Sequence, residues 1–119
     1  MTIPQPTKKD IIAINQSIGE QGTLHNQGSI DFALSQAKGK KAWLQELSYF
    51  VRSLLVDHAF HDGNKRTALV LVITYLEDRD LDYDKDYLLR AIWKISKNNI
   101  SSINRIMGAI KGGIVFRKG

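Results

Sequence analysis

The sequence contains no cysteine and only two prolines among its 119 residues. The absence of cysteine excludes disulfides, thiol catalysis and zinc sites built on thiolates. Long hydrophobic runs are also missing, because the longest uncharged apolar stretch, Thr67 to Leu76, is too short to span a bilayer. Residues 1–6 lack the apolar core of a signal peptide. We therefore expect a cytoplasmic protein without a membrane segment.

The composition is that of an ordinary soluble domain, with 43% hydrophobic and 24% charged residues. A chain of this length is expected to form one domain over residues 1–119 and to bury a real core. The net charge of +5 and the pI near 9.6 favour anionic partners. No basic stripe stands out, so solvated surface lysines are favoured over a nucleic-acid groove. The basic residues considered are Lys8-Lys9, Lys38 with residues 40–41, Lys65-Arg66 and Arg117-Lys118.

The spacing of apolar residues predicts an all-α fold, a compact bundle of about six helices around a buried central helix. The central helix is expected at Thr67–Leu76, which is apolar on every side. Its periodicity alone also fits a buried strand, but its length and helical surroundings favour a helix. The acidic segment 78–86 does not match a calcium loop and is expected to be a connection, briefly extended at 81–83. The other helices are expected at 7–18 after a Thr7 capping box, 29–38 after a Ser29 cap, 42–57, 86–97 and 101–111.

The most informative segment is His58-Ala59-Phe60-His61-Asp62-Gly63-Asn64-Lys65-Arg66. Asn64 follows an Asp-Gly turn and is a good helix N-cap, so Lys65 and Arg66 should fall in the first helical turn. Positive charge is unfavourable there, because the helix dipole is already positive at its N-terminus. Two cations at this place make electrostatic sense if an anion binds, and phosphate is the usual one.

This segment resembles the signature of the Fic/Doc (Fido) family, H-x-F-x-[D/E]-G-N, and continues as N-K-R-T-A-L like its Doc, or death-on-curing, branch. The resemblance implies a helical fold that binds a nucleoside triphosphate with Mg²⁺. Fic-type members transfer AMP to a protein hydroxyl, and they carry glycine at the place of Lys65 and arginine at the place of Leu69. The Doc branch departs at the same two places and transfers the terminal phosphate of ATP to a threonine of elongation factor Tu, which halts translation. By resemblance, this chain is a protein kinase of unusual fold that acts as a toxin.

The resemblance also implies roles for single residues. His58 would be the general base, because imidazole titrates near neutral pH. Asp62 would carry the Mg²⁺ ion, a hard cation that prefers carboxylate and phosphate oxygens. Without the rest of the segment, a histidine that simply ends a helix would be the preferred interpretation of His58. For Asp62 alone, a plain Asp-Gly turn fits equally well. The implied catalytic residues are His58, Asp62 and Arg66, and the implied phosphate-binding residues are Gly63, Asn64, Lys65, Arg66 and Thr67.

Three further residues receive structural interpretations. Phe60 is expected to anchor the loop in the core rather than to contact a ligand. His61 is expected at the rim, and no third ligand is evident that would make it part of a metal site. Thr67 is expected to contact either a phosphate or the backbone of its own helix.

The resemblance implies a protein partner as well. No serine or threonine is followed at the required spacing by the pair of the inhibitory motif [S/T]-x-x-x-E-[G/N]. Restraint is therefore expected from a separate, acidic antitoxin such as Phd, whose disordered segment would fold as a helix in an apolar groove. Two alternatives to the kinase remain open: an AMP or nucleotidyl transferase of the Fic type, and a non-catalytic basic helical binding module.

Overall fold

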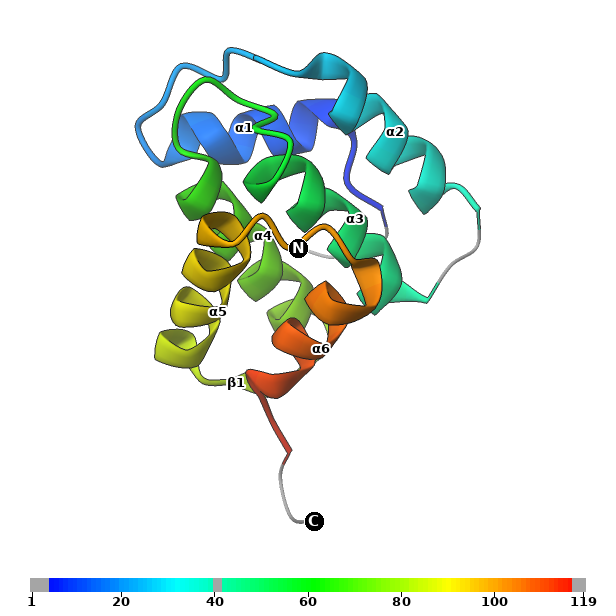
Figure 1. Cartoon of the computed structure of the whole chain (residues 1–119), viewed down its shortest axis with the longest axis vertical. Coiled ribbons are helices and arrows are strands. Elements are labelled where there is room, and N and C mark those ends of the chain that lie inside the picture. Colours follow the sequence, from blue (N-terminus) through cyan, green and yellow to red (C-terminus); the bar gives the residue numbers. More distant parts are fainter. Residues whose placement is uncertain (1–4, 40–41, 117–119) are drawn as a thin grey trace.

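Six helices and one small two-stranded sheet make up the described residues, 5–39 and 42–116, of the computed structural model (Figure 1). This confirms the expected all-α bundle. None of the helices in these two ranges is long and apolar enough to cross a membrane. The elements are α1 (Lys8–Ser17), α2 (Gln27–Ala37), α3 (Trp43–Leu55), α4 (Asn64–Asp78), β1 (Asp82–Tyr83), α5 (Lys85–Lys97), α6 (Ile103–Gly112) and β2 (Ile114–Val115).

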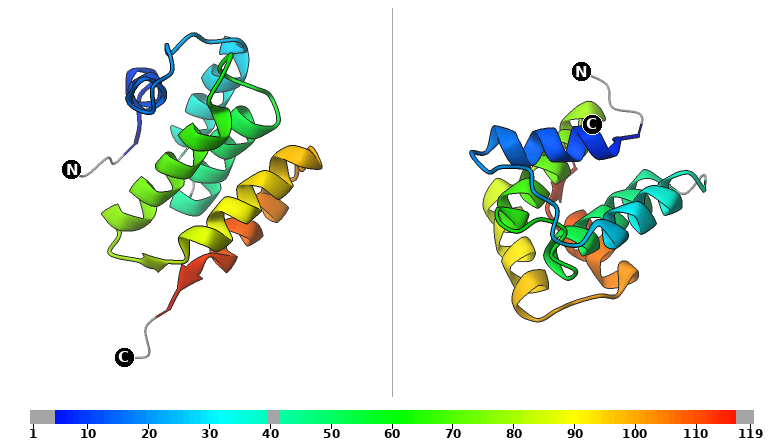
Figure 2. Two further views of the ribbon diagram at one scale, coloured as in Figure 1. Left: turned by 90° about the vertical axis from the view of Figure 1, so that its left-hand side faces the viewer. Right: turned by 90° about the horizontal axis from the view of Figure 1, so that it is seen from above.

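Helices α3 and α4 form the centre of the bundle. Helix α3 packs against α2, α4 and α6, and α4 packs against α1, α3 and α5, as the two views of Figure 2 show. No residue from Thr67 to Leu76 is exposed, so the prediction of a buried helix rather than a strand is confirmed. The fully buried side chains Phe50, Leu54 and Leu71 are among those that fill the space between these helices.

One polar pair lies inside this core and joins α3 to α4. The Tyr75 hydroxyl donates a hydrogen bond of 2.6 Å to Oε1 of Glu46, and both residues are buried. Burial raises the pKa of Tyr75, and the neighbouring Glu46 carboxylate raises it further. The pair satisfies both polar groups, so the hydrogen bond offsets the cost of taking them out of water.

Side chains cap the N-termini of α1, α2, α5 and α6. The Thr7–Asp10 capping box at the start of α1 is confirmed, with bonds of 2.8 and 3.2 Å. The prediction that Ser29 caps the second helix is wrong, because Asn26 caps α2 and receives the Ser29 N–H at 3.2 Å. The cap therefore lies three residues earlier than predicted, and the helix begins at Gln27.

The short sheet closes the end of the bundle opposite the segment 58–66. Strand β1 lies within the segment predicted to be extended, and it pairs antiparallel with β2, with Asp82 opposite Val115. The strand after α6 was not predicted from the sequence. The Asp84 N–H also bonds to the carbonyl oxygen of Gly113 at 2.9 Å, so the start of α5 and the end of α6 are held together.

Candidate functional site

The segment 58–66 forms the loop between α3 and α4 and the first turn of α4, beside the α1–α2 connection (Figure 1). Backbone bonds tie the two connections together: the N–H groups of His25 and Asn26 both donate to the Ala59 carbonyl oxygen, at 2.7 and 3.0 Å. A single antiparallel bridge also joins Leu24 to Phe60. Phe60 is 1% exposed, which confirms that it anchors the loop in the core.

Asn64 has a different local role from the one predicted. Gly63 is the N-cap of α4, and Asn64 is the first helical residue, so the prediction of an Asn64 cap is wrong. The Asn64 side chain instead accepts from the Phe60 N–H and donates to the Phe60 carbonyl oxygen, both at 2.9 Å. The amide group closes the loop on itself and fixes its shape.

A second asparagine, Asn15 on α1, links this helix to the loop by hydrogen bonds. It is 1% exposed, and its Nδ2 donates to the Asp62 carbonyl oxygen at 3.0 Å and to Oγ1 of Thr67 at 3.1 Å. Its Oδ1 accepts from the Gly22 N–H at 2.9 Å. Thr67 is fully buried and lines no cleft at this site, so the expectation that it contacts phosphate does not fit this geometry; its hydroxyl is a partner of Asn15.

Gly63 is required by the shape of this turn. Its φ of +78° lies in the left-handed region, and a Cβ atom placed there would lie 2.6 Å from Cγ of Glu20. No side chain caps the N-terminus of α4. The N–H groups of the first turn thus remain available to an anion in front of the helix.

A cleft of about 460 Å³ lies in front of this helix end, between the loop and α5. It brings together six of the seven residues implied by the resemblance, all except Thr67. The side chains of His58 and Asp62 are both exposed there. Residues of α5 form the opposite wall. The lining residues are Leu55, His58, His61, Asp62, Gly63, Asn64, Lys65, Arg66, Leu89, Trp93 and Ser96.

The two cations of the first turn of α4 diverge from each other. Lys65 Nζ lies 4.6 Å from the centre of the Trp93 ring, which is the geometry of a cation–π contact. Arg66 Nη2 lies 3.9 Å from Oε1 of Glu20; the Arg66 side chain is largely solvated, whereas that of Glu20 is mostly covered. The prediction that both cations fall in the first turn is confirmed, and that turn contains no acidic residue of its own.

A second cleft of about 480 Å³ lies on the other side of Asp62, between the loop and the α1–α2 connection. It shares His61 and Asp62 with the first cleft, so these two residues form the boundary between them. His61 is exposed, in keeping with the predicted rim position, and its ring meets that of His25 edge-on at 4.9 Å. The two clefts therefore lie next to each other at the exposed side chains of His61 and Asp62.

The residues present fit a magnesium ion that arrives with phosphate. The Asp62 carboxylate is exposed and forms no hydrogen bond or ion pair with another described residue. Within residues 5–39 and 42–116, no group of three or more His, Cys, Asp or Glu could hold a metal ion by itself. A single carboxylate completed by phosphate oxygens and water is a common way to bind Mg²⁺.

Sequence reasoning missed three residues that shape this site: Asn15, Glu20 and Trp93. The signal for Asn15 was its place four residues after Ile11 on the buried face of α1, where a polar side chain needs buried partners. The signal for Trp93 was its place on the outer face of a strongly amphipathic helix, where it is 56% exposed. Glu20 gave no local signal, because only the folded chain brings it to Arg66.

A comparison with known protein families identifies the same part of the chain as the one that carries the candidate site. A family model described as the Fic/DOC family matches residues 5–76, more than half of the chain. The matched range contains α1 to α3 and nearly all of α4, with the complete segment 58–66. No curated protein and no solved structure matched the chain.

Proposed function

Because the chain belongs to the Fic/DOC family, we propose that it is a toxin kinase that transfers the terminal phosphate of ATP to a hydroxyl group of a translation protein such as elongation factor Tu. Members of this family are typically transferases. The observation that carries the proposal is the cleft in which His58, Asp62 and the open N-terminus of α4 meet. Its volume of about 460 Å³ is in the range of small-molecule sites.

The reaction assigns one task to each residue. His58 takes the proton from the attacking hydroxyl, whose oxygen bonds to the γ-phosphorus while the bond from that phosphorus to the bridging oxygen breaks and ADP leaves. Lys65, Arg66 and the first-turn N–H groups of α4 stabilise the charge on the phosphoryl oxygens. Asp62 would hold a Mg²⁺ ion, which would neutralise phosphate charge. Gly63 and Asn64 shape the turn so that the backbone can approach the phosphates.

Two features support phosphate transfer over AMP transfer. Lys65 stands where Fic-type members carry glycine and adds a cation beside the phosphates. Leu69 stands where they carry a second arginine, and it packs against the hydrophobic core. The site therefore offers no arginine from that position to hold the outer phosphates of a nucleotide that donates AMP.

The partners and setting follow from the same proposal. We expect the toxin to act in the cytoplasm and to be restrained by a separate, Phd-like antitoxin. Transfer of AMP or another nucleotide to the target is the second possibility, and a basic binding module without catalysis is the third. The experiment below distinguishes all three.

The test is the intact mass of elongation factor Tu after incubation with the purified protein, ATP and magnesium. His58→Asn is the preferred variant, because His58 has a φ of +52° that asparagine tolerates better than alanine. His25→Asn is the matched control, since His25 is an exposed histidine beside the loop that lies outside the cleft. We expect a gain of one phosphate with the wild type and with His25→Asn, and none with His58→Asn.

Other outcomes decide between the alternatives. A gain of one AMP would overturn the kinase proposal in favour of nucleotidyl transfer. No change in mass, together with salt-dependent binding of random nucleic acid, would favour the binding module.

A further inference from the structure

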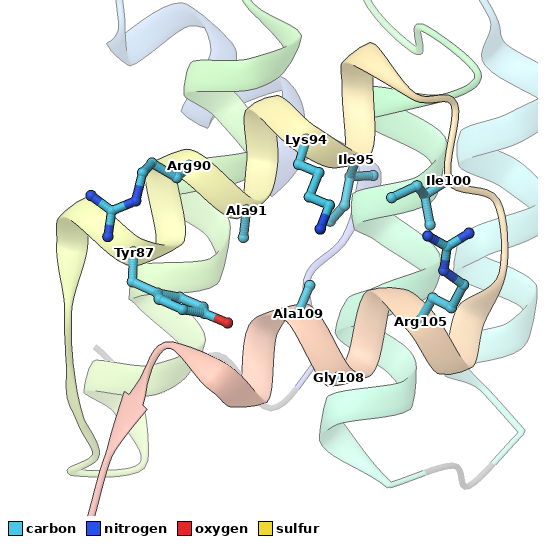
Figure 3. A pocket seen from close by; sticks show the side chains of 9 residues that line it. All are labelled: Tyr87, Arg90, Ala91, Lys94, Ile95, Ile100, Arg105, Gly108 and Ala109. Carbon is cyan, nitrogen blue, oxygen red and sulfur yellow. The ribbon is translucent and has the colours of Figure 1, made fainter.

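A third cleft lies between α5 and α6, outside the segment 58–66. The two helices run antiparallel side by side, and the cleft between them has a volume of about 500 Å³ (Figures 1 and 3). This volume is in the range of small-molecule sites, which often lie between the helices of bundles. On α5, Arg90 and Lys94 line this cleft. Leu89 and Trp93 line the first cleft instead, so α5 separates the two.

This cleft, hereafter the positive cleft, is lined by three cations. None of Arg90, Lys94 and Arg105 forms an ion pair with any residue that the structure describes, and no acidic residue lines the cleft. Residues 85–112 hold six lysines or arginines against the single Asp86, so this α5–α6 hairpin has a net charge of +5, equal to that of the whole chain. Cations without protein partners are available to an anionic ligand, and phosphate oxygens are good acceptors for both lysine and arginine.

The two ends of the positive cleft differ in chemistry. At one end, the Tyr87 side chain packs against Gly112, where an added Cβ atom would collide with it, and Tyr87 still remains 39% exposed. Lys94 and Arg105 lie farther along the cleft, as Figure 3 shows. Lys94 follows Tyr87 by seven residues on α5, and Arg105 precedes Gly112 by seven on α6. A rise of 1.5 Å per residue therefore separates the aromatic ring from the two cations by about 10 Å along the helices.

The floor between these two ends is apolar and open. Its residues Ala91, Gly108 and Ala109 are all small. A Cβ atom added to Gly108 would meet no atom within 4 Å. Ile95 and Ile100 add apolar surface beside the cations. The positive cleft therefore has room for an organic group next to an anionic one.

We propose that the positive cleft binds a nucleoside di- or triphosphate, at a site separate from the proposed ATP site. The base stacks on Tyr87, the sugar lies over the small residues of the floor, and Lys94 and Arg105 hold the phosphates from the two helices. Inorganic phosphate alone would occupy one end of the cleft and leave Tyr87 and the floor uncovered. The inference does not depend on the proposed transfer reaction.

A nucleic-acid strand fits the positive cleft less well. Proteins bind such strands in basic grooves several nucleotides long, with several aromatic side chains on which successive bases stack. Tyr87 is the one aromatic residue among those that line this cleft in the described part of the chain. Outside residues 85–112, acidic and basic residues are equal in number, so the positive charge does not continue as a longer groove. The aromatic surface and the charge suit a single nucleotide.

The test is a titration of isotope-labelled protein with GDP, followed by the shifts of backbone amide signals in two-dimensional NMR spectra. GDP is the probe because it is not a product of the proposed reaction, and EDTA removes the divalent ions on which phosphate binding at Asp62 would depend. We expect saturable shifts that are largest at Ala91, Gly108 and Ala109. GDP should bind about tenfold more tightly than inorganic pyrophosphate, which has two phosphates but no base or sugar.

Charge variants locate the phosphates. Lys94→Gln combined with Arg105→Gln should weaken the binding of GDP and of pyrophosphate by about tenfold or more, because both ligands lose the same two partners. The matched control combines Lys97→Gln with Lys111→Gln. It removes the same charge from the same two helices outside the cleft and should weaken binding by less than about threefold.

Variants of the aromatic end and the floor locate the base and sugar. Tyr87→Leu should weaken the binding of GDP by about tenfold and leave that of pyrophosphate unchanged, whereas Tyr87→Phe keeps the ring and should bind GDP like the wild type. Gly108→Leu fills the floor and should also weaken the binding of GDP by about tenfold. Thermal unfolding checks that this variant stays folded, as expected from the open space around its Cβ atom.

Several outcomes would overturn the proposal. Shifts that are largest at Gly63 and Asn64 would place GDP in the first cleft. Equal losses in the two charge variants, or pyrophosphate binding as tight as that of GDP, would show attraction by charge alone. No saturation at about 1 mM GDP, or tighter binding of a single-stranded oligonucleotide with the same shifts, would also contradict it. Normal transfer activity in the Tyr87 variants would leave the proposed function intact and separate the two results.

Discussion

The two parts of this molecule, α1–α4 and the α5–α6 hairpin, are organised by different forces. In the first part, the buried Asn15 and the half-buried Asn64 form five hydrogen bonds, three of them to residues of the segment 58–66 and two to Gly22 and Thr67 beside it. Outside residues 85–112 the chain has eleven cations and eleven carboxylates, so this part is nearly neutral overall. The hairpin contributes no residue to that segment, but it carries the net charge and one wall of the site.

The difference separates chemistry from recognition. The family model matches residues 5–76 and ends within α4, so the residues proposed for transfer all lie in the part that the family shares. The hairpin supplies Trp93 beside Lys65 and the positive cleft on its other face. We therefore expect substitutions in the first part to abolish the reaction or destabilise the fold, and substitutions in the hairpin to change binding.

Loss of the general base should have the largest effect. His58→Asn is expected to lower the initial rate of transfer by about 10²- to 10⁴-fold, because a positioned base contributes that much. The free energy of unfolding should change by less than about 0.5 kcal/mol, since His58 is exposed. Transfer rates and urea unfolding measure the two effects. A large loss of stability would show that the histidine has a structural role instead.

Removal of the Asn15 amide should be the largest change in stability. Asn15→Ala leaves three partners without their bonds and is expected to lower the free energy of unfolding by about 2–4 kcal/mol. Asn104→Ala is the matched control on α6, where the side chain is exposed, and should cost less than about 0.5 kcal/mol. Similar costs for the two variants in urea unfolding would contradict the proposed difference between the two parts.

The buried Tyr75–Glu46 pair predicts a pH dependence of stability. Because burial raises the pKa of Tyr75, the unfolded chain loses this proton first as the pH rises above about 10. The unfolded state is thereby favoured, and the free energy of unfolding should fall with rising pH in that range. Tyr75→Phe should cost about 1–3 kcal/mol at neutral pH and make the alkaline decline shallower. An unchanged alkaline slope in this variant would contradict the assignment.

The same substitution should have opposite signs in the two parts. Gly63→Ala places a Cβ atom at positive φ and against Glu20, so it is expected to cost about 1–3 kcal/mol. Gly108→Ala adds a Cβ atom to open space within α6 and should stabilise the protein by about 0.5–1 kcal/mol. Thermal unfolding of both variants checks the prediction, which fails if the two shifts have the same sign.

The smallest effect is expected where the hairpin meets the site. Trp93→Leu removes the cation–π contact with Lys65 and should raise the KM for ATP by about two- to fivefold with little change in kcat. Trp93→Phe keeps an aromatic face and should restore most of the affinity. A large fall in kcat would place Trp93 in the reaction itself.

Much of the fold follows from local rules that the sequence displays. Helical periodicity, the Thr7 capping box and the apolar stretch of α4 each predict an element that the structure contains. The Ser29 cap failed because Asn26, three residues earlier, also fits the rule and is tied to Ala59 of the neighbouring loop. Local sequence preferences cannot show which of two suitable residues forms the N-cap when a long-range contact determines the choice.

The site was predictable to the extent that it lies within one segment. Six of the seven implied residues lie together because they are neighbours in the chain. Asn15 and Glu20 join them only when the chain folds. The place of Asn15 on the buried face of α1 was a sequence signal for a buried polar contact but not for this site, and Glu20 gave no local signal. The positive cleft between α5 and α6 could not be predicted for the same reason. Arg90 and Arg105 lie on different helices and come to line one cleft only when the two helices pack together.

The most direct test of the central claim is the transfer of label from ATP to a protein in a translation extract. Two reactions are compared, with ATP labelled in the γ-phosphate or in the α-phosphate, each with the wild type and with His58→Asn. The account predicts that the wild type transfers the γ-label alone to a protein of the translation machinery and that His58→Asn transfers neither. Transfer of the α-label, or equal labelling by His58→Asn, would contradict it.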